Sequence, residues 1–319
     1  MHQKNQVVEN PLPTSIGMNW KIKSLLLFAI LLSIGCGNFE QPKSKGTEYA
    51  SVESLAEVDE FVNSGEGWKL IDLRKPEEFK EGHILGAVNV WRTDITDTSY
   101  AYGGMMPTQG HMEQLLSRLG ITPKDTIVIY DEKAECDAAR LWWILKFYGH
   151  QNTKLLNGGL ASWKRLGKEL AIDNHPFRST IYRFESEPDS SMLMMFQSVR
   201  SSSDSTLLLI DTRGKEEYSG EFHKSGAAYP GHIKGAINLD WAVAVDYDGT
   251  QKFLSAQELK ARYAAIGIDG TKPVVTYCHS GVRSAHTLFV LTELLGYRNI
   301  KNYDGSWIEW SHLNGQNLR

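Results

Sequence analysis

Cysteine is scarce in this chain, and its positions share no pattern. Cys36, Cys136 and Cys278 lie far apart, so the sequence has no CxxC pair, no metal-ligand spacing and no disulfide framework. Lys/Arg-rich runs are also missing, and the formal net charge is −4. A nucleic-acid partner therefore has no electrostatic footprint here. The 319 residues, 41% of them hydrophobic, are typical of a globular protein with room for two domains.

The N-terminal region has no apolar run that would cross a bilayer comfortably. Its apolar stretch, residues 24–35, follows Lys21 and Lys23 and stops just before Cys36. A spanning helix needs about 20 apolar residues, whereas a signal peptide has a basic start and a shorter apolar core. Residues 1–35 are therefore expected to be an N-terminal extension with a signal peptide.

The signal resembles that of a bacterial lipoprotein, which implies cleavage before Cys36 and a lipid on that cysteine. Ser33 stands where leucine is usual, so simple secretory cleavage and a retained anchor stay open. Residues 1–17 are polar, which favours Met18 over Met1 as the start. We expect an exported protein on the periplasmic side, attached to a membrane only through Cys36, with residues 36–50 as a polar linker.

An internal repeat organises the rest of the chain. Three segments recur with near-identical motifs, and the order of the motifs is the same in both copies. The repeated pairs are residues 69–74 with 208–213, 82–89 with 231–238, and 126–131 with 273–278. Repeats this long indicate two large similar units and exclude a solenoid of short ones.

Each unit alternates short β-branched runs with amphipathic stretches, which predicts an α/β fold with a parallel sheet flanked by helices. Expected strands cover 126–130, 153–156, 207–211, 274–277 and 300–303. Expected helices cover 137–148, 256–266 and 284–295. The expected boundaries are 51–180 for the first domain, 181–205 for a linker around one short helical piece, and 206–319 for the second domain.

Cys278 is the strongest candidate for chemistry. It follows the strand ending at Tyr277 and opens a loop that runs into a helix near Ser284. Amide groups of such a loop and the positive end of the helix favour thiolate over thiol, which makes Cys278 a candidate nucleophile. Gly281 permits a tight turn, and His279 and Arg283 add basic groups. The alternative is a buried structural cysteine.

These motifs resemble those of the tandem-domain rhodanese sulfurtransferases, from about residue 51 to the end. The resemblance rests on Asp-x-Arg, Gly-His-Ile-x-Gly-Ala-x-Asn, the cysteine loop, and the Asp304-Gly-Ser-Trp motif near the terminus. It implies that the second domain is catalytic and that the first is not, because Asp131 stands in the place of Cys278. It also implies a persulfide on Cys278, formed from a small sulfane-sulfur donor and discharged to cyanide or a thiol, with no cofactor and no metal.

The resemblance and the loop chemistry assign further roles. The loop His279, Ser280, Gly281, Val282, Arg283 and Ser284 is expected to stabilise the persulfide, with His279, Ser280 and Arg283 also contacting substrate. Arg213 is expected to steer an anionic donor, the alternative being an ion pair with Asp211, Glu216 or Glu217. Asp211 is expected to tie down loop backbone. Arg283 favours thiosulfate, and 3-mercaptopyruvate remains the alternative donor.

Several alternatives stay open. A cysteine phosphatase also uses a thiolate loop before a helix, but Arg283 comes one position too early for that chemistry. A non-turnover sulfur carrier would keep the same cysteine. Cys136 aligns with Arg283 and not with the nucleophile, so we interpret it as a bystander, with oxidation sensitivity as the alternative. His83 and His232 belong to the motif in both units, which favours a structural role.

Overall fold

The computed structural model describes residues 49–64, 67–172, 177–201 and 207–315. The expected signal peptide, its Cys36 and most of the 36–50 linker lie outside these residues. Among the described residues, no helix is long and apolar enough to cross a membrane.

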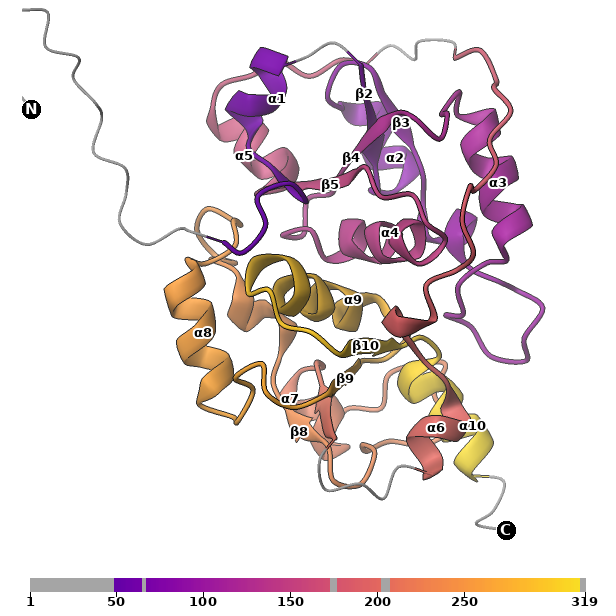
Figure 1. The fold of residues 1–319 in the computed structure, drawn as a ribbon, viewed down its shortest axis with the longest axis vertical. Coiled ribbons are helices and arrows are strands. Elements are labelled where there is room, and N and C mark those ends of the chain that lie inside the picture. The colour runs from indigo at the N-terminus through magenta and orange to yellow at the C-terminus, as the bar shows by residue number, and fades with distance from the viewer. Residues whose placement is uncertain (1–48, 65–66, 173–176, 202–206, 316–319) are drawn as a thin grey trace, which may run out of the picture. The chain divides into compact units, whose positions relative to one another are not determined.

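The first unit is built on a five-stranded sheet in the order β1-β5-β4-β2-β3, with every pair parallel. Helices connect successive strands and cover the sheet (Figure 1). The strands are β1 (Leu55–Ala56), β2 (Trp68–Asp72), β3 (Ala87–Asn89), β4 (Thr126–Tyr130) and β5 (Thr153–Leu156). The helices are α1 (Val58–Ser64), α2 (Pro76–Glu81), the 3₁₀ turn η1 (Arg92–Ile95), α3 (Gln109–Arg118), α4 (Cys136–Phe147) and α5 (Gly159–Arg165).

The second unit repeats this order as β6-β10-β9-β7-β8, again all parallel. Its strands are β6 (Leu193–Met194), β7 (Leu208–Asp211), β8 (Ile237–Asn238), β9 (Val274–Tyr277) and β10 (Ile300–Tyr303). Its helices are η2 (Ser190–Met192), α6 (Phe196–Ser201), α7 (Lys215–Ser219), η3 (Trp241–Ala244), α8 (Ala256–Ala264), α9 (Val282–Phe289), the π-helical turn η4 (Val290–Leu294) and α10 (Ser306–Gly315). The predicted duplication and parallel α/β architecture are confirmed.

The repeated Gly-His-Ile motif makes the same contacts in both units. His83 bonds the Phe79 carbonyl oxygen at 3.0 Å and stacks on its ring, with ring centroids 3.8 Å apart. His232 bonds the Tyr218 carbonyl oxygen at 2.8 Å and stacks on that ring at the same separation. Each motif histidine thus packs against the short helix that precedes it in its unit.

The stretch expected as a linker, residues 181–205, contains a strand of the second sheet as well as the short helix expected there. Within it, β6 pairs in parallel with β10, in the register Asn302↔Leu193, and α6 follows. Phe196 and Val199 of α6 belong to the buried cluster under the second sheet. Residues 193–201 are therefore part of the second unit, whereas Tyr182 and Phe184 still bond to the first unit. A two-residue strand has too few positions to show an alternating pattern.

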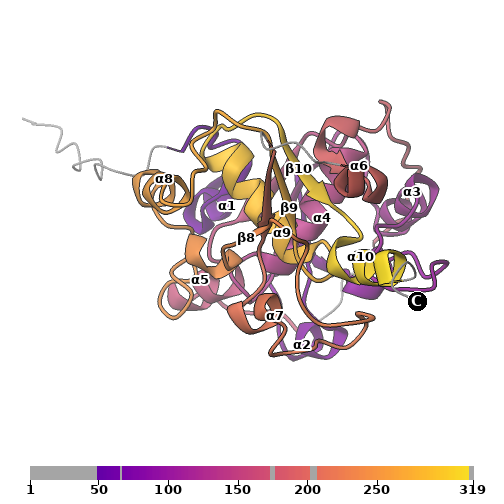
Figure 2. The same cartoon turned by 90° about the horizontal axis from the view of Figure 1, so that it is seen from below.

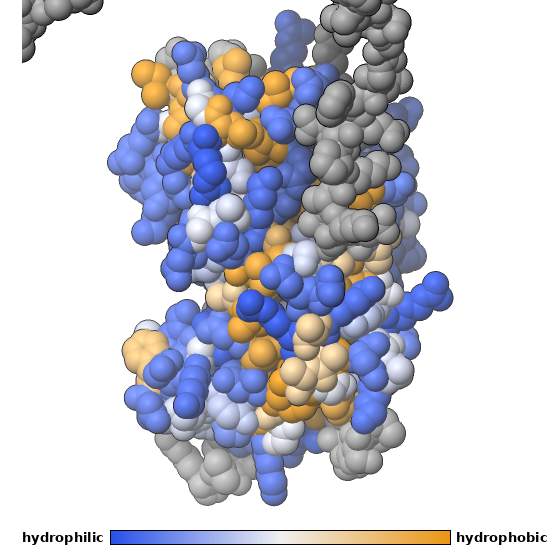
Figure 3. Space-filling view, turned by 90° about the vertical axis from the view of Figure 1, so that its left-hand side faces the viewer, coloured by the Kyte–Doolittle hydropathy of each residue, from blue (hydrophilic) through white to orange (hydrophobic). Residues whose placement is uncertain are grey.

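The two units meet along α4 and α9, which lie side by side in both ribbon views (Figures 1 and 2). Trp142 of α4 meets Phe289 of α9 edge to face, with ring centroids 4.9 Å apart, and both side chains are fully buried. One apolar cluster includes residues from both units, so they share a core. The face in Figure 3 shows separate apolar groups among polar ones. Each of the two helices follows the loop after the central strand of its sheet, so the two loops come together.

Candidate active site

Cys278 lies at the carboxyl end of β9, the central strand of the second sheet, and α9 begins at Val282. Its side chain is 1% exposed. The carboxyl edge of a parallel sheet is where ligands bind in open α/β folds, because loops and helix N-termini converge there. The Cys278 loop has this position.

Ser306 holds the loop in shape from the start of α10. Its hydroxyl oxygen accepts the backbone N–H groups of Cys278 at 3.1 Å and Gly281 at 3.0 Å, and its O–H donates to the Tyr303 carbonyl at 2.7 Å. Gly281 has φ +75°, and a Cβ there would lie 2.5 Å from the Asp304 carbonyl oxygen. Only glycine satisfies both the backbone angle and the close approach.

The surroundings of the Cys278 sulfur favour its thiolate. Burial alone would raise the pKa of the thiol, but the Arg283 guanidinium, the amides of Ser284 and Ser280 and the Ser284 hydroxyl outweigh it. The pKa of Cys278 therefore lies below its ordinary value. The Ser284 Oγ lies 3.6 Å from the sulfur and donates to it. A lowered pKa is what a nucleophilic cysteine needs near neutral pH.

Arg283 is itself held by a carboxylate. Its Nη1 donates to Glu217 Oε2 at 2.5 Å and its Nη2 donates to Oε1 at 3.0 Å. This pairing outweighs the effect of burial and lowers the pKa of Glu217. The two-pronged bond fixes the guanidinium plane beside the thiol.

A cavity of about 160 Å³ opens beside the thiol and draws on both units. Four of its twelve lining residues are Lys or Arg, and one is a carboxylate. The lining consists of Arg92, Lys133, Cys136, Asp137, Lys224, Trp241, Tyr247, Cys278, His279, Ser280, Val282 and Arg283. Such a cavity suits a small anion.

Five of the expected site residues come together here. His279, Ser280, Val282 and Arg283 line the cavity with Cys278, while Gly281 and Ser284 support the loop from behind. The His279 Nε2 lies 3.0 Å from the Ser225 carbonyl oxygen. Burial lowers the pKa of His279 to about 4, so the ring is neutral at pH 7 and donates this bond from Nε2–H. His279 adds no positive charge for a substrate.

Arg213 was expected to contact the substrate, but it lies outside the cavity beside Cys278. Its side chain is 2% exposed and does not line the cavity. Its Nε donates to Asp211 Oδ1 at 2.9 Å and its Nη2 donates to Oδ2 at 2.5 Å and to the Gly231 carbonyl at 2.7 Å. The ion pair with Asp211, the alternative reading of the sequence, is what the structure contains. Asp211 also accepts the Arg213 backbone N–H at 3.0 Å.

The first unit's equivalent loop holds a carboxylate where the second holds sulfur. Asp131 Oδ1 accepts the N–H groups of Lys133 and Glu135 at 2.7 and 3.0 Å. Its Oδ2 accepts those of Asp137 and Ala138 at 2.8 and 2.9 Å. The anion cradle of this loop is thus filled by its own side chain, which has no sulfur to carry.

Cys136 is the residue whose position the sequence reading anticipated least. Its backbone stands at the start of α4, and its thiol lines the same cavity as Cys278. Burial, Asp137 and Asp131 raise the pKa of this thiol well above its ordinary value. Cys136 is therefore a neutral thiol at pH 7, and its pKa is shifted in the direction opposite to that of Cys278.

Arg92 is a cavity residue that sequence reasoning missed. It opens η1 just after the repeated Gly-His-Ile motif, and Trp241 opens η3 at the equivalent place in the second unit. Both line the cavity. Each follows the carboxyl end of a strand, β3 or β8, at the same place in the repeat. This position in the sequence could have indicated that both residues lie near a ligand site. Lys224 and Tyr247 carried no such signal.

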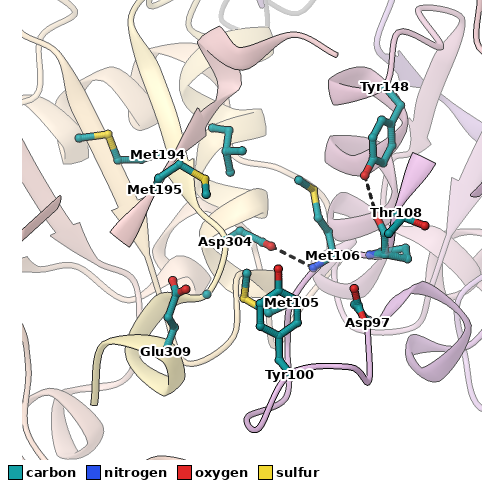
Figure 4. Close-up of a pocket in the computed structure, with 13 residues that line it drawn as sticks. Asp97, Tyr100, Met105, Met106, Thr108, Tyr148, Met194, Met195, Asp304 and Glu309 are labelled. Carbon is teal, nitrogen blue, oxygen red and sulfur yellow. Dashed lines mark hydrogen bonds between the residues drawn. The ribbon is translucent and has the colours of Figure 1, made fainter. Parts of the chain in front are cut away.

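A second cavity, of about 190 Å³, lies where residues 97–108 meet residues 193–195 and 304–309 (Figure 4). Asp304 accepts the Met106 N–H at 2.9 Å and pairs with Arg140 at 2.6 Å. Arg140 in turn donates to the Gly281 carbonyl at 3.3 Å and the Gly104 carbonyl at 3.0 Å. This ion pair connects the wall of the second cavity to the backbone of the Cys278 loop.

Within the part of the chain that the structure describes, no group of three or more His, Cys, Asp or Glu side chains is arranged to hold a metal. The site lies between two α/β units of equal topology, with a thiol of lowered pKa in one of them and a basic cavity lined by both.

Comparison with known proteins identifies the family to which this fold and site belong. The Rhodanese-like domain model matches twice, over residues 54–166 and 197–313. A protein from Mycolicibacterium smegmatis, provisionally named a thiosulfate sulfurtransferase, is 39% identical over 244 residues, which are 74% of this chain and 86% of that protein. Sulfur carrier protein TtuD of Thermus thermophilus is 35% identical over 280 residues, 84% of this chain and 96% of that protein.

The crystal structure of SseA from Escherichia coli, titled as a 3-mercaptopyruvate sulfotransferase, superposes with a TM-score of 0.69. It is 26% identical and covers 80% of this chain and 98% of SseA. The chain belongs to the rhodanese-like family, with two tandem domains, and it is an enzyme of the sulfurtransferase class.

Proposed function

We propose that this protein is a thiosulfate sulfurtransferase that carries sulfur on Cys278. The observation that carries the proposal is the cavity, which places a buried thiol of lowered pKa among four basic side chains. An anionic donor is attracted to that cavity, and the lowered pKa of Cys278 favours the nucleophilic thiolate. The provisional name of the M. smegmatis relative supports the choice of donor.

The reaction divides into two displacements at sulfur. The Cys278 thiolate attacks the outer sulfur of thiosulfate, the S–S bond of the donor breaks, and sulfite leaves with the bonding electron pair. The enzyme then holds Cys278–S–S⁻. Cyanide or a thiolate attacks the terminal sulfur, leaves as thiocyanate or as a persulfide, and returns the Cys278 thiolate.

The loop suits both anionic states of the cycle. The Ser280 and Ser284 amides and the Ser284 hydroxyl face the sulfur, and Arg283 adds a fixed positive charge. None of these groups has to exchange a proton as thiolate becomes persulfide and returns. Preorganised donors of this kind stabilise an anion without reorganising during the reaction. The cycle needs neither a metal nor another cofactor.

Steady-state kinetics with cyanide as acceptor tests the proposal. We expect thiocyanate to form catalytically, with a higher kcat/KM for thiosulfate than for 3-mercaptopyruvate. Mass spectrometry of donor-treated protein should find one added sulfur, on Cys278. A higher kcat/KM for 3-mercaptopyruvate would transfer the assignment to the second candidate donor, which the likeness to SseA favours. Absence of any added sulfur on Cys278 would overturn the mechanism.

The likeness to a sulfur carrier favours a second candidate function. A carrier loads one sulfur on the same cysteine and then waits for a dedicated protein acceptor. A single-turnover burst followed by a stall, with excess cyanide present, would identify a carrier. Continued thiocyanate formation identifies an enzyme.

We infer from the sequence that the protein is exported and lipid-anchored at Cys36, with Met18 as the start. Residues 1–48 lie outside the described part of the chain, so support comes only from the basic start, the short apolar run and the cysteine after it. Globomycin treatment of expressing cells, followed by membrane fractionation, tests this. Persistence of the mature form with free Cys36 would favour secretory cleavage.

A further inference from the structure

Lys224 has a position that the reaction as described leaves unused. It belongs to the stretch between α7 and the Gly-His-Ile motif of the second unit, and its side chain reaches the cavity of Cys278. The other three basic residues of the cavity each have a carboxylate partner. Arg92 Nε and Lys133 Nζ lie 3.5 and 3.7 Å from the Asp137 carboxylate, and Arg283 is bonded to Glu217. Lys224 has no ion-pair partner among the described residues.

The charges around Lys224 are therefore unbalanced. Partial loss of solvent lowers the pKa of its ammonium group, and Arg283 and Arg92 lower it further, while Glu217 and the Cys278 thiolate raise it. The net effect is a lowered pKa. A second anion in the cavity would reverse this repulsion, because it would stand among Lys224, Arg283 and Arg92. The basic side chains of the cavity can therefore bind one anion in addition to the Cys278 thiolate.

The structure also holds Lys224 in place. The neighbouring Ser225 carbonyl accepts the bond from His279 Nε2, at 3.0 Å. The His279 side chain is 5% exposed, and a Cβ added at Gly226 would lie 3.8 Å from its Nε2. The second residue of the catalytic loop is therefore the anchor of the segment that carries Lys224. This bond holds the backbone next to Lys224 against the Cys278 loop.

We propose that Lys224 is a donor-binding residue that makes the cavity select doubly charged sulfur donors over singly charged ones. The inference rests on the proposed function and names the part of the site that reads the donor. Thiosulfate carries two negative charges, whereas an alkyl thiosulfonate such as methanethiosulfonate carries one and has a methyl group in place of one oxygen. Both donors present the same type of sulfane sulfur to Cys278, so they differ in the group that Lys224 would meet.

The physical effect should fall on binding of the donor. Sulfite leaves with the charge that Lys224 contacts, so the contact is made both before and during the displacement. An interaction of equal strength in the bound donor and the transition state changes KM and leaves kcat nearly constant. A charge-assisted hydrogen bond at a partly exposed site contributes about tenfold in affinity.

Paired variants and paired donors test the proposal. Lys224→Met keeps length and removes charge, and Lys234→Met is the matched control, because Lys234 is an exposed lysine further along the same connection that does not line the cavity. We expect Lys224→Met to lower kcat/KM for thiosulfate about tenfold, mainly through a higher KM. The kcat/KM for methanethiosulfonate should stay within about twofold of the wild-type value. Lys234→Met should change neither. An equal loss for both donors, or no loss for either, would overturn the selective role.

Direct binding separates this proposal from the proposed function. Calorimetric titration of Cys278→Ser with thiosulfate measures donor affinity without turnover, and adding Lys224→Met should weaken it about tenfold. Lys224-dependent binding to an enzyme that forms no thiocyanate would overturn the function and keep the donor site. Turnover of thiosulfate with binding that is indifferent to Lys224 would keep the function and overturn this inference.

Discussion

The Arg283 guanidinium lies between the Glu217 carboxylate, to which it donates two hydrogen bonds, and the Cys278 thiol, whose pKa it lowers. Glu217 belongs to α7 and Arg283 to the first turn of α9, so the ion pair connects two helices of the second unit. In the proposed mechanism, this cation beside the buried sulfur takes the place of the general base that other cysteine enzymes use, so that charge and not proton transfer activates Cys278.

Removal of the Arg283 charge should raise the pKa of Cys278. In Arg283→Met we expect the pH at which alkylation by iodoacetamide is half-maximal to move upward. The thiolate is the reactive form, so at neutral pH alkylation becomes slower and kcat/KM for the donor falls. Glu217→Gln combined with Arg283→Met separates this effect from the unpaired buried carboxylate that the single variant leaves. An unchanged or lowered midpoint in both variants would contradict the role of Arg283.

The two thiols of the cavity should behave differently. We expect Cys278→Ser to abolish persulfide formation and sulfur transfer, and Cys136→Ser to retain most activity. Cys136 is neutral at pH 7 because burial and two nearby carboxylates raise the pKa of its thiol. Thiocyanate formation and intact-mass measurement check both variants. Equal loss in both would show that the two thiols act together.

The strands were predictable because each is a short β-branched run bounded by turn residues. The strands at 126–130, 153–156 and 300–303 have the predicted bounds, and the parallel sheets followed from the alternation of strands and helices. The position of the Cys278 loop was predictable for the same reason, since a strand end, a glycine and a helix start are local signals.

Other features depend on contacts between distant segments. The helix expected over 284–295 begins at Val282, because Gly281 is fixed by Ser306 and Asp304 from another part of the chain. From Val290 it continues as a π-helical turn. The cavity itself is built from two units. The family resemblance placed Arg213 at the donor, but Asp211, two residues earlier, holds its guanidinium in the interior.

Asp131 should make stability depend on pH in the direction opposite to an ordinary ion-paired aspartate. Burial and then Asp137 raise its pKa to about 6, despite the amide bonds that favour the charged form. The folded state therefore binds a proton more readily than the unfolded state between about pH 4 and 6. The contribution of Asp131 to stability is present below pH 4 and is lost as pH rises through 6.

Urea unfolding at pH 7 and pH 5 checks this behaviour. The free energy of unfolding of the wild type should gain a contribution on acidification that Asp131→Asn lacks, so the difference between the two proteins changes with pH. Asp125→Asn, at the end of the preceding loop, is a control on pH effects from other carboxylates. A difference between wild type and Asp131→Asn that is constant with pH would contradict the raised pKa.

Gly104 of the first unit lies directly against Ser280 of the Cys278 loop. A Cβ there would lie 2.5 Å from the Ser280 Cβ, and the backbone has φ +94°. We therefore expect Gly104→Ala to lower the free energy of unfolding by about 1–3 kcal/mol and to reduce kcat/KM, since the loop of Cys278 must shift to make room. Gly103→Ala is the matched control, because nothing lies within 4 Å of its added Cβ. Urea denaturation and thiocyanate kinetics on both variants measure the two effects. If Gly103→Ala and Gly104→Ala reduce kcat/KM equally, flexibility of the segment and not its contact with Ser280 is what the catalytic loop requires.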